Sequence, residues 1–178
     1  MTEDDQQRRR VGRDVAVIVG VFLLAGVVVG LVWPHLFDPA VAVRTPEGIS
    51  TDEVQLGKEF ASDGWFIVLG MGVGLVLGLL LMLTRHTHEV VSLLAIVAAA
   101  AAAAYVAAQL GAAVGPADPA SILEKADVGA SAPTQVRLES SVGYLIWPLF
   151  AALGALLVLW RGPVRHRDAA TVVHSPSA

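Results

Sequence analysis

Cysteine is absent from this chain of 178 residues. Its absence excludes disulfides, thiolate nucleophiles and the Cys-x-x-Cys motif that a membrane thiol oxidoreductase needs. Two other enzyme signatures are missing as well, the His-Glu-x-x-His motif of zinc proteases and the Gly-x-Ser-x-Gly motif of serine hydrolases. We therefore predict that the chain is not an enzyme, and that it has no catalytic residue and no cofactor.

Metal ligands are also scarce in the sequence. His86 and His88 stand close together in a short basic turn, but no third ligand accompanies them. The acidic residues Asp52, Glu53 and Glu59 lack the spacing of a calcium-binding loop. We interpret both groups as solvated surface charges and predict no metal site. The chain also lacks a stripe of basic residues, so we expect no nucleic-acid partner.

Charged side chains are missing from four long apolar stretches, each of about 20 residues, which is enough to cross a bilayer core as a helix. The stretches are residues 15–33, 64–84, 90–111 and 140–160. Hydrophobic residues make up 55% of the chain, more than the roughly 45–50% of soluble domains. Because no stretch holds an Asp, Glu, Lys, Arg or His, the intramembrane carboxylate of a proton-coupled carrier is missing.

These stretches predict an all-α membrane protein with a four-helix transmembrane bundle, in a membrane domain of residues 15–160. Residues 1–14 are expected to form a mobile polar tail, and residues 161–178 a disordered one. The loops 34–63 and 112–139 are expected to form a small cap together. A signal peptide is the competing interpretation of the first stretch, but that stretch exceeds the roughly 7–15 residues of a signal core.

The basic residues predict the orientation. Most of them flank the side shared by both termini and the short second loop: Arg8, Arg9, Arg10, Arg13, Arg85, Arg161, Arg165 and Arg167. The two long loops are net acidic. The positive-inside rule therefore places both termini in the cytoplasm and the cap outside the plasma membrane. In this orientation Trp33, Trp65 and Trp147 are expected at the outer interface and Trp160 at the inner one, as an aromatic belt.

The two long loops contain signals of local structure. Val41–Arg44 resembles a strand that enters a type I turn at Thr45-Pro-Glu-Gly48. Asp118 followed by Pro119 is typical of a helix start, so a short helix is expected over 119–126. The segment 135–138 is a candidate strand that could pair with the first strand.

Glycines recur at every fourth position in two stretches. Gly70, Gly74 and Gly78 share one helix face in the second stretch, and Gly26 and Gly30 form a similar pair in the first. Small residues at this spacing let two helices approach closely in lipid. The face could contact another helix of the same chain, a second copy or another membrane protein, and the sequence leaves these alternatives open.

Five residues are candidates for a role at the outer interface: Asp63, Asp118, Arg137, Trp147 and Pro148. Asp63 stands before the second stretch, where it could cap the helix N-terminus or coordinate something at the surface. Pro148 removes a backbone hydrogen bond inside the fourth stretch, so a kink is expected there, which serves either packing or gating.

Four segments carry a resemblance to a known family. They are Leu31-Val-Trp33-Pro34, Ser62-Asp-Gly-Trp-Phe66, Gly111 to Asp118 with Gly115-Pro116, and Arg137-Leu138 with Ile146-Trp-Pro-Leu149. In this order the chain resembles small four-span membrane proteins of actinobacteria, named domain of unknown function 2567. The resemblance covers roughly residues 15–160 and implies a plasma-membrane protein of actinobacterial origin, but no catalytic residue.

We therefore expect a non-enzymatic accessory or scaffold protein of the cell envelope. Its partners would be the lipid bilayer and another membrane protein or a second copy of itself. The alternative is a small transporter or channel for a neutral or lipid-like solute, lined by Gly70, Gly74, Ala101 and Gly111.

Overall fold

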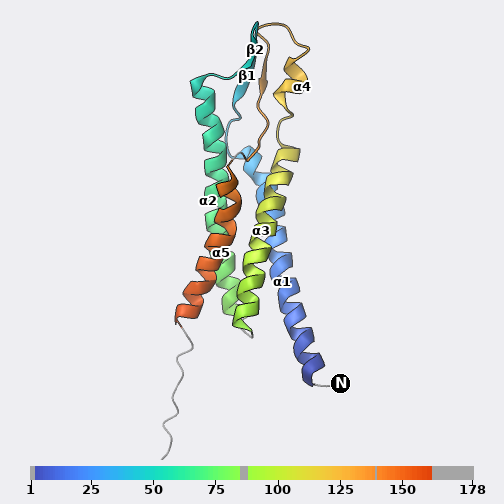
Figure 1. The fold of residues 1–178 in the computed structure, drawn as a ribbon, viewed down its shortest axis with the longest axis vertical. Helices are drawn as coiled ribbons and strands as arrows, with labels where there is room; N and C mark the ends of the chain where they lie inside the picture. Colours follow the sequence, from blue (N-terminus) through green and yellow to red (C-terminus); the bar gives the residue numbers. More distant parts are fainter. Residues whose placement is uncertain (1–2, 85–87, 139, 162–178) are drawn as a thin grey trace, which may run out of the picture.

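The computed structural model describes residues 3–84, 88–138 and 140–161. Four long helices dominate the described chain, and three short strands with one short helix form a separate layer at one end (Figure 1). The elements in order are α1 (Glu3–Val32), the 3-10 turn η1 (Trp33–His35), β1 (Val41–Thr45), β2 (Gly48–Ser50), α2 (Glu53–Thr84), α3 (Glu89–Val114), α4 (Pro119–Leu123), β3 (Ser131–Pro133) and α5 (Ser141–Arg161).

The long helices α1, α2, α3 and α5 are each long and apolar enough to cross a membrane, as in a multi-pass membrane protein. In their most apolar windows only 28% to 39% of the residues are buried inside the protein. Most residues of these windows are therefore at least partly exposed, and they include large apolar side chains such as Leu24, Val68 and Leu94. Soluble monomers rarely expose contiguous apolar patches larger than a few hundred Å². The structure thus contains the four predicted helices, each long and apolar enough to span a membrane.

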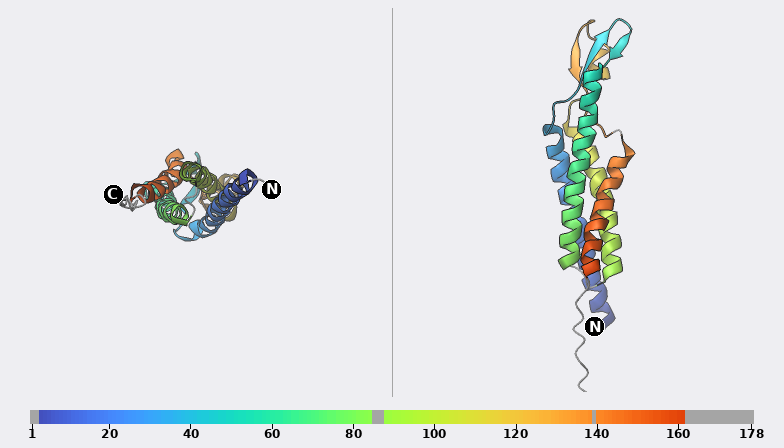
Figure 2. Two further views of the ribbon diagram at one scale, coloured as in Figure 1. Left: turned by 90° about the horizontal axis from the view of Figure 1, so that it is seen from below. Right: turned by 90° about the vertical axis from the view of Figure 1, so that its left-hand side faces the viewer.

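The bundle consists of two helix pairs. α2 packs mainly against α5, α1 packs mainly against α3, and contacts between α3 and α5 join the two pairs. The view along the bundle in Figure 2 shows the pairs beside each other. Both described ends of the chain lie at the end of the bundle that is opposite the strands (Figure 1).

Two helices begin earlier than predicted. α1 starts at Glu3, so the predicted tail 1–14 is helical where it is described. α2 starts at Glu53 rather than at Gly64, because Asp52 provides the helix cap: its Oδ1 accepts a hydrogen bond from the Gln55 backbone N–H at 2.9 Å. The loop predicted over 34–63 is therefore shorter. Of the predicted tail 161–178, only Arg161 lies within the described residues.

The two long connections form the layer at one end of the bundle, which we call the cap: β1, β2, α4 and β3. Its sheet has the order β2-β1-β3, and both neighbouring pairs are antiparallel. Ala42, Leu123 and Ala132 form its small buried core. Asp118 caps α4 by accepting from the Ala120 N–H at 2.9 Å, as predicted.

The strand predicted over 135–138 is wrong. The chain pairs with β1 four residues earlier, at Ser131–Pro133, where Ala132 lies opposite Ala42. Val136 and Leu138 are instead buried in the core of the bundle, while Arg137 between them is exposed. The alternation of apolar and polar residues that predicted a strand thus reflects an extended segment that inserts every second side chain between the helices.

Candidate functional site

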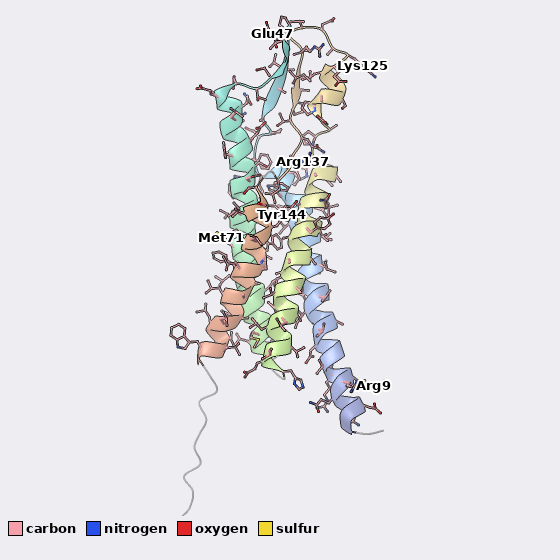
Figure 3. All side chains as sticks on the ribbon, in the orientation of Figure 1. Arg9, Glu47, Met71, Lys125, Arg137 and Tyr144 are labelled. Carbon is pink, nitrogen blue, oxygen red and sulfur yellow. The ribbon has the colours of Figure 1, made fainter. Side chains whose placement is uncertain are left out.

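The candidate site lies where the cap meets the bundle. There the segment 134–138 runs from β3 to α5 past the end of α3. Figure 3 shows Arg137 and Tyr144 at this junction, whereas Glu47 and Lys125 lie at the far end of the cap and Arg9 at the opposite end of the molecule. Two pockets open at the junction, and Gln135 and Arg137 line both of them.

The larger pocket has a volume of about 310 Å³ and lies between α3, α5 and the extended segment. Its polar lining comes from Gln109, Gln135, Arg137 and Tyr144. On α3, Ala108 and Ala112 also line it, and as small residues they leave space that longer side chains would fill. The volume lies at the lower end of the roughly 300–1,000 Å³ that small-molecule pockets occupy.

The smaller pocket has a volume of about 50 Å³ and lies on the α2 side of the same segment. Lys58, Glu59 and Ser62 of α2 contribute to its lining. The Ser62 side chain is only 6% exposed, and its Oγ has no hydrogen-bond partner within the described structure. A buried hydroxyl beside a space of this size is a place where one or two water molecules can bind.

A buried aromatic cluster lies below the smaller pocket. Trp33 Nε1–H donates a hydrogen bond to the Ser62 carbonyl oxygen at 3.0 Å. The Trp33 and Phe66 rings meet edge to face with centroids 4.9 Å apart, and Phe66 lies 5.9 Å from Trp147. These contacts connect η1, α2 and α5 at the cap end of the bundle.

The cluster corrects the predicted aromatic belt. Trp33 and Trp147 are both 0% exposed, so neither indole lies at a lipid interface. Each indole lies instead against a glycine where no larger side chain would fit: Trp33 against Gly111 and Trp147 against Gly70. Only Trp65 and Trp160, which are 44% and 88% exposed, face outward as an aromatic belt requires.

Asp63 connects two helices rather than starting one. It lies inside α2, and its Oδ2 accepts a hydrogen bond from the Ser140 backbone N–H at 3.1 Å, just before α5 begins. The predicted cap of the second span is therefore wrong, because α2 already begins at Glu53. The carboxylate instead satisfies a donor at the N-terminus of α5, where an anion is favourable.

The other predicted residues are dispersed. Arg137 lines both pockets, and Asp118 caps α4 within the cap. Pro148 lies inside α5 beside the buried Trp147. The structure thus brings Arg137 to the junction, near the end of α5 that Asp63 holds, and places Trp147 and Pro148 deeper in the bundle and Asp118 in the cap.

The glycine faces are occupied within the chain. A Cβ atom on Gly74 would lie 2.7 Å from the Trp147 carbonyl oxygen, and one on Gly78 would overlap the Ala151 backbone. In α1, a Cβ on Gly26 or Gly30 would lie 2.6 Å or 2.8 Å from a carbonyl oxygen of α3. The sequence left three alternatives for these faces: another helix of the same chain, a second copy or another membrane protein. In the structure both faces contact another helix of the same chain.

Sequence reasoning missed Gln109, Gln135 and Tyr144 as a group with Arg137. Two of them stand at the ends of apolar stretches, Gln109 at the end of the third and Tyr144 at the start of the fourth. Successive spans run antiparallel, so these two ends meet at the same side of the bundle. Polar side chains at the adjoining ends of two apolar stretches could thus have predicted that Gln109 and Tyr144 lie close together.

No metal site is formed by the described residues, since no three histidine or acidic side chains come together among them. His86 lies outside the described residues, and the His88 ring nitrogen Nε2 lies 3.3 Å from the Gln7 side-chain nitrogen.

No protein-family model, no curated protein and no solved structure matches this chain. The resemblance to domain of unknown function 2567 therefore stays an expectation from the sequence.

Proposed function

We propose that this chain is a non-enzymatic scaffold or accessory protein of the plasma membrane, which holds its cap at the outer surface for a partner in the cell envelope. The continuity of α2 carries this proposal. The helix runs from Glu53, beside the sheet, to Thr84 at the other end of the bundle, without a break. The Val41 N–H donates to Gln55 Oε1 at 2.9 Å, which ties the first strand of the cap to α2. A cap mounted in this way presents a fixed surface.

The cap supports binding of a partner better than the glycine faces do. Those faces are filled by helices of the same chain, so they offer no free groove. The cap and the residues that flank it in the chain are net acidic, with Asp38, Glu47, Asp52, Asp118, Glu124 and Asp127 against Arg44 and Lys125. Complementary charge speeds encounter and selects partners, so a partner with a basic surface fits the cap.

The geometry favours the scaffold over a channel or transporter. Gly70 and Gly111 each contact a buried tryptophan, and Gly74 contacts the backbone of α5. Ala101 is exposed on the outer surface of α3. The four residues expected to line a solute path therefore do not face a common space.

The orientation can be tested with single cysteines, because the chain has none of its own. Ser131 is exposed in the cap, and Gln6 is exposed near the opposite end of the molecule. We expect a membrane-impermeant maleimide to label Ser131→Cys in intact cells, and Gln6→Cys only after permeabilisation. The reverse pattern would place the cap in the cytoplasm and contradict the proposal.

Partner binding can be tested by purifying the tagged chain from its native membrane in a mild detergent and identifying bound proteins by mass spectrometry. Glu47→Gln, Glu124→Gln and Asp127→Asn together remove three exposed charges of the cap. We expect this triple variant to lose a stoichiometric membrane partner that the wild type retains. Asp5→Asn, a neutralisation at the opposite end, is the control and should retain it. A chain that emerges alone, or a complex that survives the triple substitution, would contradict the scaffold.

A further inference from the structure

We propose that the larger pocket at the junction binds the phosphate-bearing headgroup of an anionic membrane lipid, with Arg137 as its main ligand. We call it the headgroup pocket, and define it by Gln109, Gln135, Arg137 and Tyr144. This inference goes beyond the scaffold function and does not depend on it.

The charge of the pocket suits an anion. Arg137 is the one charged side chain in its described lining, and within the described chain it makes no hydrogen bond or ion pair. A guanidinium presents five N–H donors in a planar fork that matches two phosphate oxygens at once. In the smaller pocket, by contrast, Lys58 and Glu59 both contribute, so that their charges offset each other.

The remaining polar groups can complete a phosphate site. The side-chain amides of Gln109 and Gln135 each offer two N–H donors, and the Tyr144 hydroxyl offers one. These groups come from three separate segments: α3, the extended segment and α5. Donors that converge from separate segments on a space of about 310 Å³ form a concave site rather than a flat charged surface.

The depth of the pocket points to a lipid. Gln109 lies at the cap end of the apolar stretch of α3, and Tyr144 lies in the first turn of α5. These positions correspond to the level of the lipid headgroups, where amphipathic tyrosine rings are enriched. The volume is sufficient for a headgroup but not for acyl chains, which would stay in the bilayer.

A path for an acyl chain continues from the pocket along α3. Tyr105 and Ala101 precede Gln109 at intervals of four residues, so the three residues share one face of the helix. All three are exposed. A lipid whose phosphate lies at Arg137 can therefore extend its acyl chain along this exposed face, toward the middle of α3.

The test uses the full chain in phosphatidylcholine vesicles that contain a minor fraction of phosphatidylglycerol. Lipids that stay bound after gentle detergent extraction are counted by native mass spectrometry. We expect the wild type to retain phosphatidylglycerol in preference to phosphatidylcholine. Arg137→Gln should lower that retention about tenfold or more, because it removes charge-assisted hydrogen bonds of roughly 1.5–3 kcal/mol. Lys125→Gln removes one positive charge from the far end of the cap and should change retention less than about twofold.

Two further variants separate binding from folding. Tyr144→Phe keeps the ring that packs against the bundle core and removes only the hydroxyl. We expect this variant to retain about threefold to tenfold less phosphatidylglycerol, with an unchanged melting temperature. Arg137→Lys keeps the charge but loses the planar fork, and should retain an intermediate amount.

The outcomes also distinguish a lipid from free phosphate. Inorganic phosphate is added as a competitor, and its own binding to the wild type and to Arg137→Gln is measured by calorimetry. Failure of phosphate to displace the lipid supports the headgroup. If phosphate bound alone and displaced the lipid, the pocket would be a site for soluble phosphate, and the lipid proposal would be overturned. Equal retention by the wild type and by Arg137→Gln, or an equal loss with Lys125→Gln, would overturn the site itself.

Discussion

The contact between α2 and α5 provides the sharpest test of the fold, through a single methyl group. In Gly74→Ala the new Cβ would lie 2.7 Å from the Trp147 carbonyl oxygen and 3.2 Å from the Ala151 backbone nitrogen. Both neighbours are backbone atoms, so relief requires the two helices to separate. A gap of roughly 0.5–1 Å forfeits about a quarter to a half of the dispersion attraction of each contact. Overpacking of this kind costs about 1–3 kcal/mol.

A matched control isolates this packing term. Gly72 lies on the same helix, is exposed, and has no atom within 4 Å of the place where a Cβ would stand. Gly72→Ala therefore changes only the helix propensity, which favours alanine by about 1 kcal/mol in water. We expect Gly74→Ala to be about 1–3 kcal/mol less stable than Gly72→Ala.

The assay is reversible unfolding in mixed micelles with increasing dodecyl sulfate, followed by circular dichroism. The free energy of unfolding of each variant is extrapolated to zero denaturant. Equal stabilities of the two alanine variants would refute the close approach of α2 and α5, and would leave the glycine face free for a second chain.

Three further predictions concern the junction and the cap. Trp33→Phe removes the hydrogen bond to the Ser62 carbonyl and part of a fully buried ring, so it should lower the free energy of unfolding by about 1–3 kcal/mol in the same micelle assay. Asp118→Ala removes the N-cap of α4, and should increase amide hydrogen exchange in α4 by an amount that corresponds to about 0.5–2 kcal/mol. The pair Val43→Cys and Ser131→Cys should form a disulfide on mild oxidation, because the two residues lie directly opposite each other.

Each of these predictions has a control within the same chain. Trp65→Phe affects an outward-facing ring and should change stability by less than about 0.5 kcal/mol. Asp127→Ala lies in the cap but outside α4 and should leave exchange in α4 unchanged. Val43→Cys with Gln135→Cys should not cross-link, since β3 pairs with β1 at Ser131–Pro133. Cross-linking of this second pair in place of the first would contradict the register of the sheet.

The number of the long helices and the position of their apolar parts could be predicted because a lipid environment leaves few alternatives. A backbone in hydrocarbon must satisfy its own hydrogen bonds, so long uncharged stretches are helices. The strand at residues 41–44 and the helix start at Asp118 followed local rules of turn and cap chemistry, and the structure contains both.

The start of α2 was missed although a local signal was present. Asp52 and Gln55 have the spacing of a capping box, an acceptor followed three residues later by Glu or Gln. The pair Asp63-Gly64, directly before the apolar stretch, resembled a helix start more strongly. Its carboxylate instead accepts a hydrogen bond from Ser140, a contact between residues far apart in the chain that no local pattern reveals.

The junction could not be predicted for a similar reason. The burial of Trp33 and Trp147 depends on glycines of other helices, Gly111 and Gly70, which open the space for the indole rings. In the sequence, a tryptophan near the end of an apolar stretch fits an interfacial belt equally well. Only the pairing of the helices decides whether such a tryptophan is buried against a glycine or lies at the lipid interface.

The sheet of the cap imposes an order on the biogenesis of the protein. Its first and third strands are separated in the chain by α2 and α3, and they pair directly at Val43 and Ser131. In the orientation proposed above, the third strand reaches the outer side of the membrane only after α3 has been inserted. Until then the edge of β1 that will accept it is open. A chain stalled after two spans would thus carry an unpaired strand edge, which is a template for pairing with another chain. In that orientation, the sheet can close only in a chain whose first three helices have all been inserted.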